Sequence, residues 1–136
     1  MDSITDLIVN TYHVDIEDIP WMETRPGMEV RRIYSDPERG INVLQMRAQP
    51  WVTTGPHRHE GMVLGITTRG AWSHDPKEFN YKPGSFIAEP NEVHRFFNGP
   101  EVSEVFFISG PGATVDYDDA GNEVLRRGDP NDALQG

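Results

Sequence analysis

The sequence contains no cysteine among its 136 residues. Disulfide bonds and thiolate metal ligands are therefore excluded. Basic residues are also scarce, with 12 Lys and Arg against 22 Asp and Glu, so the formal net charge is −10. Because this charge repels phosphate backbones and anionic lipid surfaces, we expect neither nucleic acid nor membranes among the partners.

Long apolar runs and several well-known catalytic motifs are also missing. No run reaches transmembrane length, and the opening residues, MDSITDLIVN, lack the apolar region of a secretory leader. No glycine-rich loop opens a helix for phosphate binding, and no G-x-S-x-G elbow is present. These absences predict a soluble cytoplasmic protein.

Short strand-like runs alternate with turn signals along most of the chain. The 13 glycines and 11 prolines are scattered rather than clustered, which suits many turns. The clearest runs lie at 28–35, 41–48, 62–68, 77–81 and 103–109. Many short strands at this spacing predict an all-β sandwich or small barrel, and the length allows one domain.

We expect three segments along the chain. Residues 1–20 form an N-terminal arm or edge strand, although Ser3 and Asp6 would also suit the start of a short helix. Residues 21–125 form the barrel, and residues 126–136 form a flexible C-terminal tail.

Three histidines are the candidate chemical centre. His57 and His59 stand two residues apart, so in a strand both side chains point to the same face and can hold one divalent cation. The alternative is a solvated loop after Gly55 and Pro56. His94 lies in a later strand-like run and strengthens the metal interpretation, whereas we interpret His74 as a polar strand end.

At these residues the sequence resembles the cupin superfamily. The segments GPHRHEGMVLGITTRG and PGSFIAEPNEVHRFFN are similar to the two cupin motifs, and the likeness extends roughly from residue 13 to residue 125. More narrowly, the chain resembles the group containing acetylacetone (β-diketone) dioxygenase and 2,4′-dihydroxyacetophenone dioxygenase. The resemblance implies a single-domain antiparallel β jelly-roll barrel whose edges are covered in a homodimer.

The match departs from the general cupin pattern at two positions. Aligning the final glycine of the first motif with Gly70 places the usual glutamate ligand at Val63 and the first glycine at Trp51. Strand parity puts Val63 on the same inward face as His57 and His59. Glu60 has the opposite parity, so we expect three histidine ligands without a carboxylate.

The resemblance implies a non-haem Fe(II) dioxygenase that cleaves a C–C bond of a small diketone or hydroxyaryl ketone. The implied metal ligands are His57, His59 and His94. Three neutral imidazoles leave a divalent metal its full charge, which favours a chelating anionic substrate such as an enolate. Zn, Mn or Ni in an isomerase, cyclase or lyase is the alternative, and a non-enzymatic metal-binding module is a third reading.

Four further residues are expected around the metal. Glu89 matches a glutamate that the diketone-cleaving relatives keep near the site, and it is our candidate catalytic residue because it could orient a histidine or a water. A surface position at the strand end is the alternative for Glu89. Val63, Phe96 and Trp72 are the expected substrate-binding residues, because parity puts Val63 and Phe96 on the inward face of the histidines. The alternative is that such side chains simply fill the core of the barrel.

Overall fold

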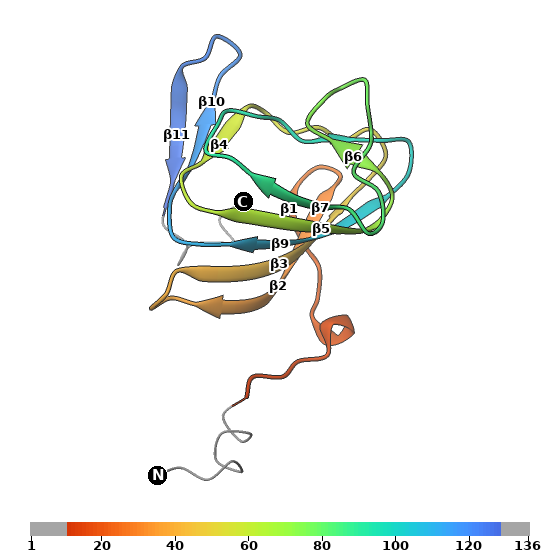
Figure 1. Ribbon diagram of the computed structural model, residues 1–136, viewed down its shortest axis with the longest axis vertical. Helices are drawn as coiled ribbons and strands as arrows, with labels where there is room; N and C mark the ends of the chain where they lie inside the picture. The colour runs from red at the N-terminus through yellow and green to blue at the C-terminus, as the bar shows by residue number, and fades with distance from the viewer. Residues whose placement is uncertain (1–10, 129–136) are drawn as a thin grey trace.

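The computed structural model describes residues 11–128, which form three antiparallel sheets and one short 3-10 helix, η1 (Ile16–Asp18) (Figure 1). The largest sheet has six strands in the order β1 (Met22–Arg25), β2 (Met28–Asp36), β3 (Ile41–Ala48), β9 (Ser103–Ser109), β5 (Val63–Arg69) and β7 (Phe86–Glu89). A three-stranded sheet contains β11 (Glu123–Arg127), β10 (Thr114–Tyr117) and β4 (His57–His59). The third sheet pairs β6 (Trp72–Ser73) with β8 (Phe97–Asn98).

The expected all-β antiparallel architecture is confirmed. Across residues 11–128 the strands belong to three separate hydrogen-bonded sheets, and no ladder joins them into one closed ring. No helix within the same range is long and apolar enough to cross a membrane. The short helix considered for the first ten residues lies outside the described part of the chain.

The core lies between the six-stranded sheet and the segments around β6 and β8, and the two smaller sheets stand above the large one in Figure 1. Its buried members come from both sides and are Met28, Val30, Met46, Ala48, Trp72, Phe96 and Val105. Full burial of a large apolar side chain stabilises a fold by about 1.5–3 kcal/mol. The core therefore holds the sheets in the arrangement that encloses the site.

Strand periodicity explains which side chains face this core. In β3, Met46 and Ala48 are buried in the core, whereas Arg47 between them is only partly buried and pairs with Glu29. Alternation of this kind is typical of an antiparallel strand with one buried face. The run expected at 77–81 forms no strand and makes only two isolated bridges, one of them from Tyr81 to Trp72.

The short strand β4 carries His57 and His59 and is held from both sides. On one side it pairs with β10, with His57 opposite Asp116 and His59 opposite Thr114. On the other side His57 forms an isolated bridge with His94, in which each backbone N–H donates to the other residue's carbonyl at 2.9 and 2.8 Å. Backbone pairing alone therefore brings together three histidines that are up to 37 residues apart in sequence.

Candidate metal centre

His57, His59 and His94 form a compact cluster at the junction of β4 and the segment before β8. Their ring centroids are 5.1 Å apart for His57 and His59, 4.6 Å for His57 and His94, and 5.1 Å for His59 and His94. Each ring offers one nitrogen, and these nitrogens lie within 4.8 Å of one another. This cluster could bind a metal ion, because imidazole nitrogens are common ligands of first-row divalent metals.

The other nitrogen of each ring is held by a neighbouring group. Nδ1 of His57 lies 2.9 Å from the carbonyl oxygen of Gly55, and Nδ1 of His94 lies 2.9 Å from that of Glu92. Since a carbonyl oxygen only accepts hydrogen bonds, both Nδ1 atoms carry the proton. Nδ1 of His59 lies 3.2 Å from Oγ1 of Thr114. In their neutral form His57 and His94 therefore have the lone pair on Nε2, as a metal ligand requires.

Burial keeps two of these rings neutral. It lowers the pKa of His57 to about 4, with the neighbouring rings of His59 and His94 lowering it further and the hydrogen bond to Gly55 opposing the shift. Burial also lowers the pKa of His59 to about 4, against the opposing charge of Glu89. Both imidazoles are consequently unprotonated at neutral pH and free to bind a cation.

Glu89 projects into the same cluster rather than toward solvent. Its side chain is only 5% exposed, and its Oε2 lies 2.5 Å from Nε2 of His94 and 3.7 Å from Nε2 of His59. Burial alone would raise the pKa of Glu89, but the close rings of His74 and His94 outweigh it and hold that pKa below its ordinary value. A surface position for Glu89, the alternative reading of the sequence, does not agree with this burial.

His74 also turns into the cluster, although the sequence favoured a polar strand end. Its Nδ1 lies 3.1 Å from the hydroxyl of Tyr81, and its Nε2 lies 3.5 Å from Oε2 of Glu89. With Glu89 and His94 it forms a second group whose ligand atoms lie within 4.8 Å of one another. The sequence does contain a signal for this inward position. His74 stands two residues after the buried Trp72, so in a strand the two side chains share one face.

Val63 lies next to this cluster on β5, with only 6% of its surface exposed. It is directly opposite Glu89 in the β5–β7 pair. Glu60, of opposite parity, pairs instead with Arg126 at 2.7 Å. An aliphatic side chain therefore occupies the position where the cupin pattern has its carboxylate.

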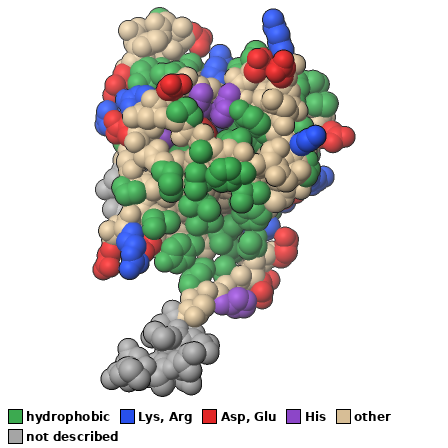
Figure 2. Space-filling model, in the orientation of Figure 1, with side chains coloured by type: hydrophobic (Ala, Val, Ile, Leu, Met, Phe, Trp, Pro, Cys, Tyr) green, Lys and Arg blue, Asp and Glu red, His purple; other side chains and the backbone are tan. Residues whose placement is uncertain are grey.

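A cavity of about 240 Å³ opens beside the histidines, and Val63, Trp72 and Phe96 all line it. Trp72 and Phe96 stack with their ring centroids 4.7 Å apart. Other apolar side chains of the wall come mainly from the six-stranded sheet and include Met28, Val30, Leu44, Met46 and Phe107. Figure 2 shows a group of histidine side chains near the upper edge of one face of the molecule, above a broad hydrophobic area.

The donors present suit a divalent first-row metal. Nε2 of His94 is buried and makes no regular hydrogen bond, although Oε2 of Glu89 lies 2.5 Å away. A buried ring nitrogen without a partner is costly, and a metal ion at this position would satisfy it. Imidazole and carboxylate donors fit Fe, Zn, Mn or Ni, and they do not by themselves select among these ions.

Fold and site together define a cupin domain with a possible three-histidine metal site. The chain belongs to the ChrR cupin-like domain family, whose sequence model matches residues 9–111. This match confirms the cupin fold expected from the two motifs. No curated protein matches the chain.

Solved structures with the same fold differ in what they do. An RmlC-like cupin protein from Ralstonia eutropha JMP134 is 23% identical, with a TM-score of 0.80 over 92% of this chain and 83% of that chain. An acetylacetone dioxygenase from Acinetobacter johnsonii is 16% identical, with a TM-score of 0.76 over 90% and 88%. A chain from the complex of Rhodobacter sphaeroides SigE with the anti-sigma ChrR is 15% identical, with a TM-score of 0.57 over 71% and 50%. A polyketide cyclase and a sugar phosphate isomerase share the fold as well.

Proposed function

We propose that the protein is a non-haem Fe(II) dioxygenase that cleaves a C–C bond of a small diketone or hydroxyaryl ketone. The observation that carries the proposal is the cluster of His57, His59 and His94 at an apolar cavity, with uncharged Val63 where cupins usually place a carboxylate. The acetylacetone dioxygenase fold supports it. His57, His59 and His94 would hold the ion, which supplies Lewis acidity and redox chemistry when bound.

The side chains around the ion would select and position the substrate. Phe96 and Trp72 stack on each other and line the cavity with aromatic surface, which suits a planar enolate or aryl ketone. Val63 adds no charge to the cavity, so an anionic chelate meets no repulsion from position 63. Glu89, with its carboxylate buried beside His94, would act at the centre itself rather than at the cavity mouth.

The test is anaerobic metal analysis of the purified protein combined with an oxygen-electrode trace. Fe(II) is added first, followed by acetylacetone, other β-diketones and hydroxyacetophenones. We expect one equivalent of iron and oxygen uptake that depends on both iron and the ketone. Bound metal without oxygen uptake on the whole panel would contradict the dioxygenase proposal, and a protein that binds no metal would contradict any metal-dependent function.

A metal-binding module without catalysis is the second candidate, and the match to the ChrR cupin-like family is the observation that favours it. In that case the ion would stabilise the domain, and removing it with a chelator would lower the unfolding temperature strongly. A third metal-dependent possibility, an isomerase or cyclase without oxygen, is supported by the cyclase and isomerase folds. It predicts substrate turnover with Zn, Mn or Ni under anaerobic conditions.

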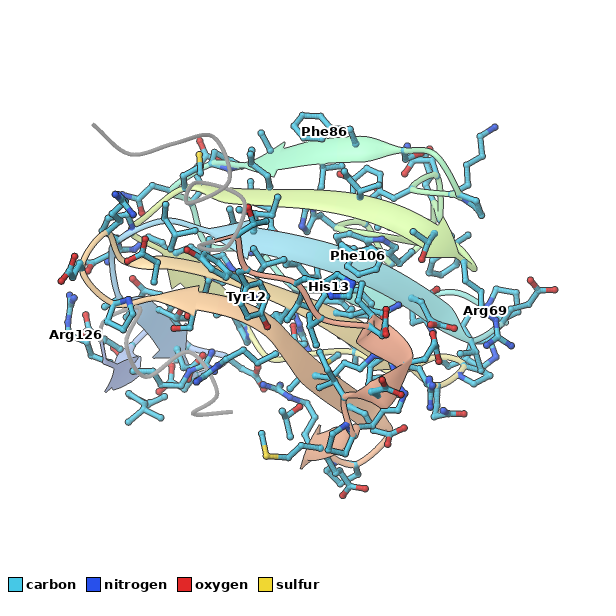
Figure 3. All side chains as sticks on the ribbon, turned by 90° about the horizontal axis from the view of Figure 1, so that it is seen from below. Tyr12, His13, Arg69, Phe86, Phe106 and Arg126 are labelled. Carbon is cyan, nitrogen blue, oxygen red and sulfur yellow. The ribbon has the colours of Figure 1, made fainter. Side chains whose placement is uncertain are left out.

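We also propose that the protein forms a homodimer through the outer face of the six-stranded sheet. On this face Ile66 lies directly between Phe86 and Phe106 in the strand register, and Leu64 lies between Ala88 and Ile108. Ile66 is 43% exposed and Phe86 is 60% exposed. Figure 3 labels Phe86 and Phe106, which belong to this surface. A contiguous apolar face of this kind typically marks a protein interface.

A further inference from the structure

We propose that Glu89 is itself a ligand of the metal ion, supplying from β7 the carboxylate that β5 lacks at position 63, and that His74 positions it. The inference rests on the proposed metal-dependent function and changes the expected three-histidine site into one with three histidines and a carboxylate. It also differs from the sequence expectation, in which Glu89 orients a histidine or a water without touching the ion.

The strand register is the first argument. Val63 and Glu89 are directly opposite in the antiparallel pair of β5 and β7. Directly opposite residues project to the same face, with Cβ atoms about 4.5–5.5 Å apart. Glu89 therefore enters the site from the position directly beside Val63. The glutamate side chain is longer than that of valine and can span the distance between the two positions.

The contact with His94 is the second argument. Nδ1 of His94 donates its proton to the carbonyl of Glu92, and Nε2 lies 2.5 Å from Oε2 of Glu89. A ring nitrogen and a carboxylate oxygen repel each other at this distance unless a proton or a metal ion lies between them, so the pair marks a position for a cation. If an ion binds Nε2 of His94, Glu89 must either bind that same ion or move away.

The surroundings of the carboxylate favour the first of these outcomes. Among residues 11–128, Glu89 makes no ion pair with Lys or Arg, and its charged contacts are with His59, His74 and His94. A side chain that is 5% exposed cannot rely on water to compensate its charge. A divalent ion bound to the same histidines would supply the missing positive charge.

His74 has the contacts of a residue that positions Glu89. Its Nε2 approaches Oε2 of Glu89 at 3.5 Å, while its Nδ1 contacts the hydroxyl of Tyr81 at 3.1 Å. If the tyrosine hydroxyl donates to Nδ1, the proton of the ring is on Nε2 and faces the carboxylate. A hydrogen bond of this kind fixes a ligating carboxylate and its orientation.

The deciding measurement is the coordination of Zn²⁺ in the full-length protein, by a zinc-loaded crystal structure together with X-ray absorption. We expect an oxygen of Glu89 at about 2.0–2.2 Å from the ion. Glu89→Gln should weaken Zn²⁺ binding by about 100-fold, but an orienting residue can cost 10–100-fold as well, so affinity alone does not decide. The visible spectrum of the Co²⁺-loaded protein should therefore change in Glu89→Gln.

Three further variants test the inference. Glu60→Gln is the matched control, because this glutamate pairs with Arg126 and should leave Zn²⁺ affinity and the Co²⁺ spectrum unchanged. The double variant Val63→Glu with Glu89→Gln should restore affinity to within about tenfold of the parent, since a carboxylate returns to the neighbouring position. His74→Asn should weaken Zn²⁺ binding by about tenfold.

A Glu89 oxygen more than about 3 Å from bound zinc, with an unchanged Co²⁺ spectrum in Glu89→Gln, would overturn the inference. That result would leave the dioxygenase proposal standing if the protein still binds iron and consumes oxygen with a ketone. Conversely, a ligating Glu89 in a protein without oxygen uptake would support the inference and contradict the dioxygenase reaction.

Discussion

His94 is the residue at which the two possible donor groups meet. It belongs both to the cluster with His57 and His59 and to the cluster with His74 and Glu89. We predict that His94→Ala weakens Zn²⁺ or Fe²⁺ binding by more than about 100-fold, exceeding the cost of losing an orienting partner. The fold should persist, because His94 joins His57 through backbone hydrogen bonds.

Metal content by mass spectrometry and far-ultraviolet circular dichroism check this prediction together. His13→Ala is the control, since its ring is exposed and contacts only Asp15 among the ion pairs of residues 11–128. A His94→Ala protein that is folded and retains one equivalent of metal would show that the ligand set is wrong.

The two low histidine pKa values predict how the metal-free protein responds to acid. The folded-state pKa of His57 and of His59 is about 4, against about 6.5 in the unfolded chain. Between these pH values the unfolded state binds more protons, so stability decreases as pH falls from about 6.5 to about 4. Each ring contributes up to about 3 kcal/mol to this loss, less where solvent reaches it.

Urea unfolding in the presence of a chelator, at pH 7 and at pH 4.5, measures this loss. The double variant His57→Asn with His59→Asn should have a flatter profile over the same interval. A parent protein whose midpoint is the same at both pH values would show that the rings are not buried as neutral groups.

At the scale of elements, the turn between β4 and β5 depends on close contact with the loop that follows β9. A side chain at Gly61 would collide with the carbonyl oxygen of Pro111, and Gly112 in the same loop has a positive φ of 138°. We predict that Gly61→Ala lowers the free energy of unfolding by about 1–3 kcal/mol, as overpacking in a tight site does. It should also weaken metal binding, because the turn sets the direction of β4.

Gly55→Ala is the matched control for this turn. A Cβ at Gly55 meets nothing within 4 Å, so this variant should unfold at nearly the same urea concentration as the parent. Equal unfolding midpoints for the Gly55 and Gly61 variants would contradict the proposed contact.

Sequence patterns predicted the elements better than the relations between them. Strand-like runs between turn signals located β3 and β9, and the parity of His57 and His59 correctly placed both rings on one face. The opposition of Val63 and Glu89 was not predictable, since register depends on pairing between strands rather than on periodicity within one.

The run at 77–81 shows a second limit of sequence patterns. Pro76 and Pro83 flank it, and since proline lacks an N–H to donate, neither can extend a ladder. The run consequently makes isolated bridges instead of a strand. His74 was missed although it stands two residues after Trp72, because β6 has only two residues and ends before His74.

At the scale of the whole molecule, the apolar outer face of the six-stranded sheet predicts the oligomeric state. We predict that Phe86→Glu converts a homodimer into a monomer, because a charge in the centre of an apolar interface loses its hydration. Sedimentation velocity measures the change. Val124→Glu is the control, since Val124 is equally exposed at 60% but lies on β11, in another sheet. A parent protein that sediments as a monomer at high concentration would contradict the interface.

The hydrogen bonds at the Nδ1 atoms of His57, His59 and His94 also have a kinetic consequence. The rings already have their orientation before an ion arrives, so capture requires no search among rotamers. The slow step should then be the loss of water from the ion itself. Metals that exchange water rapidly should enter quickly, and Ni²⁺, which exchanges it slowly, should enter late even where its final affinity is higher.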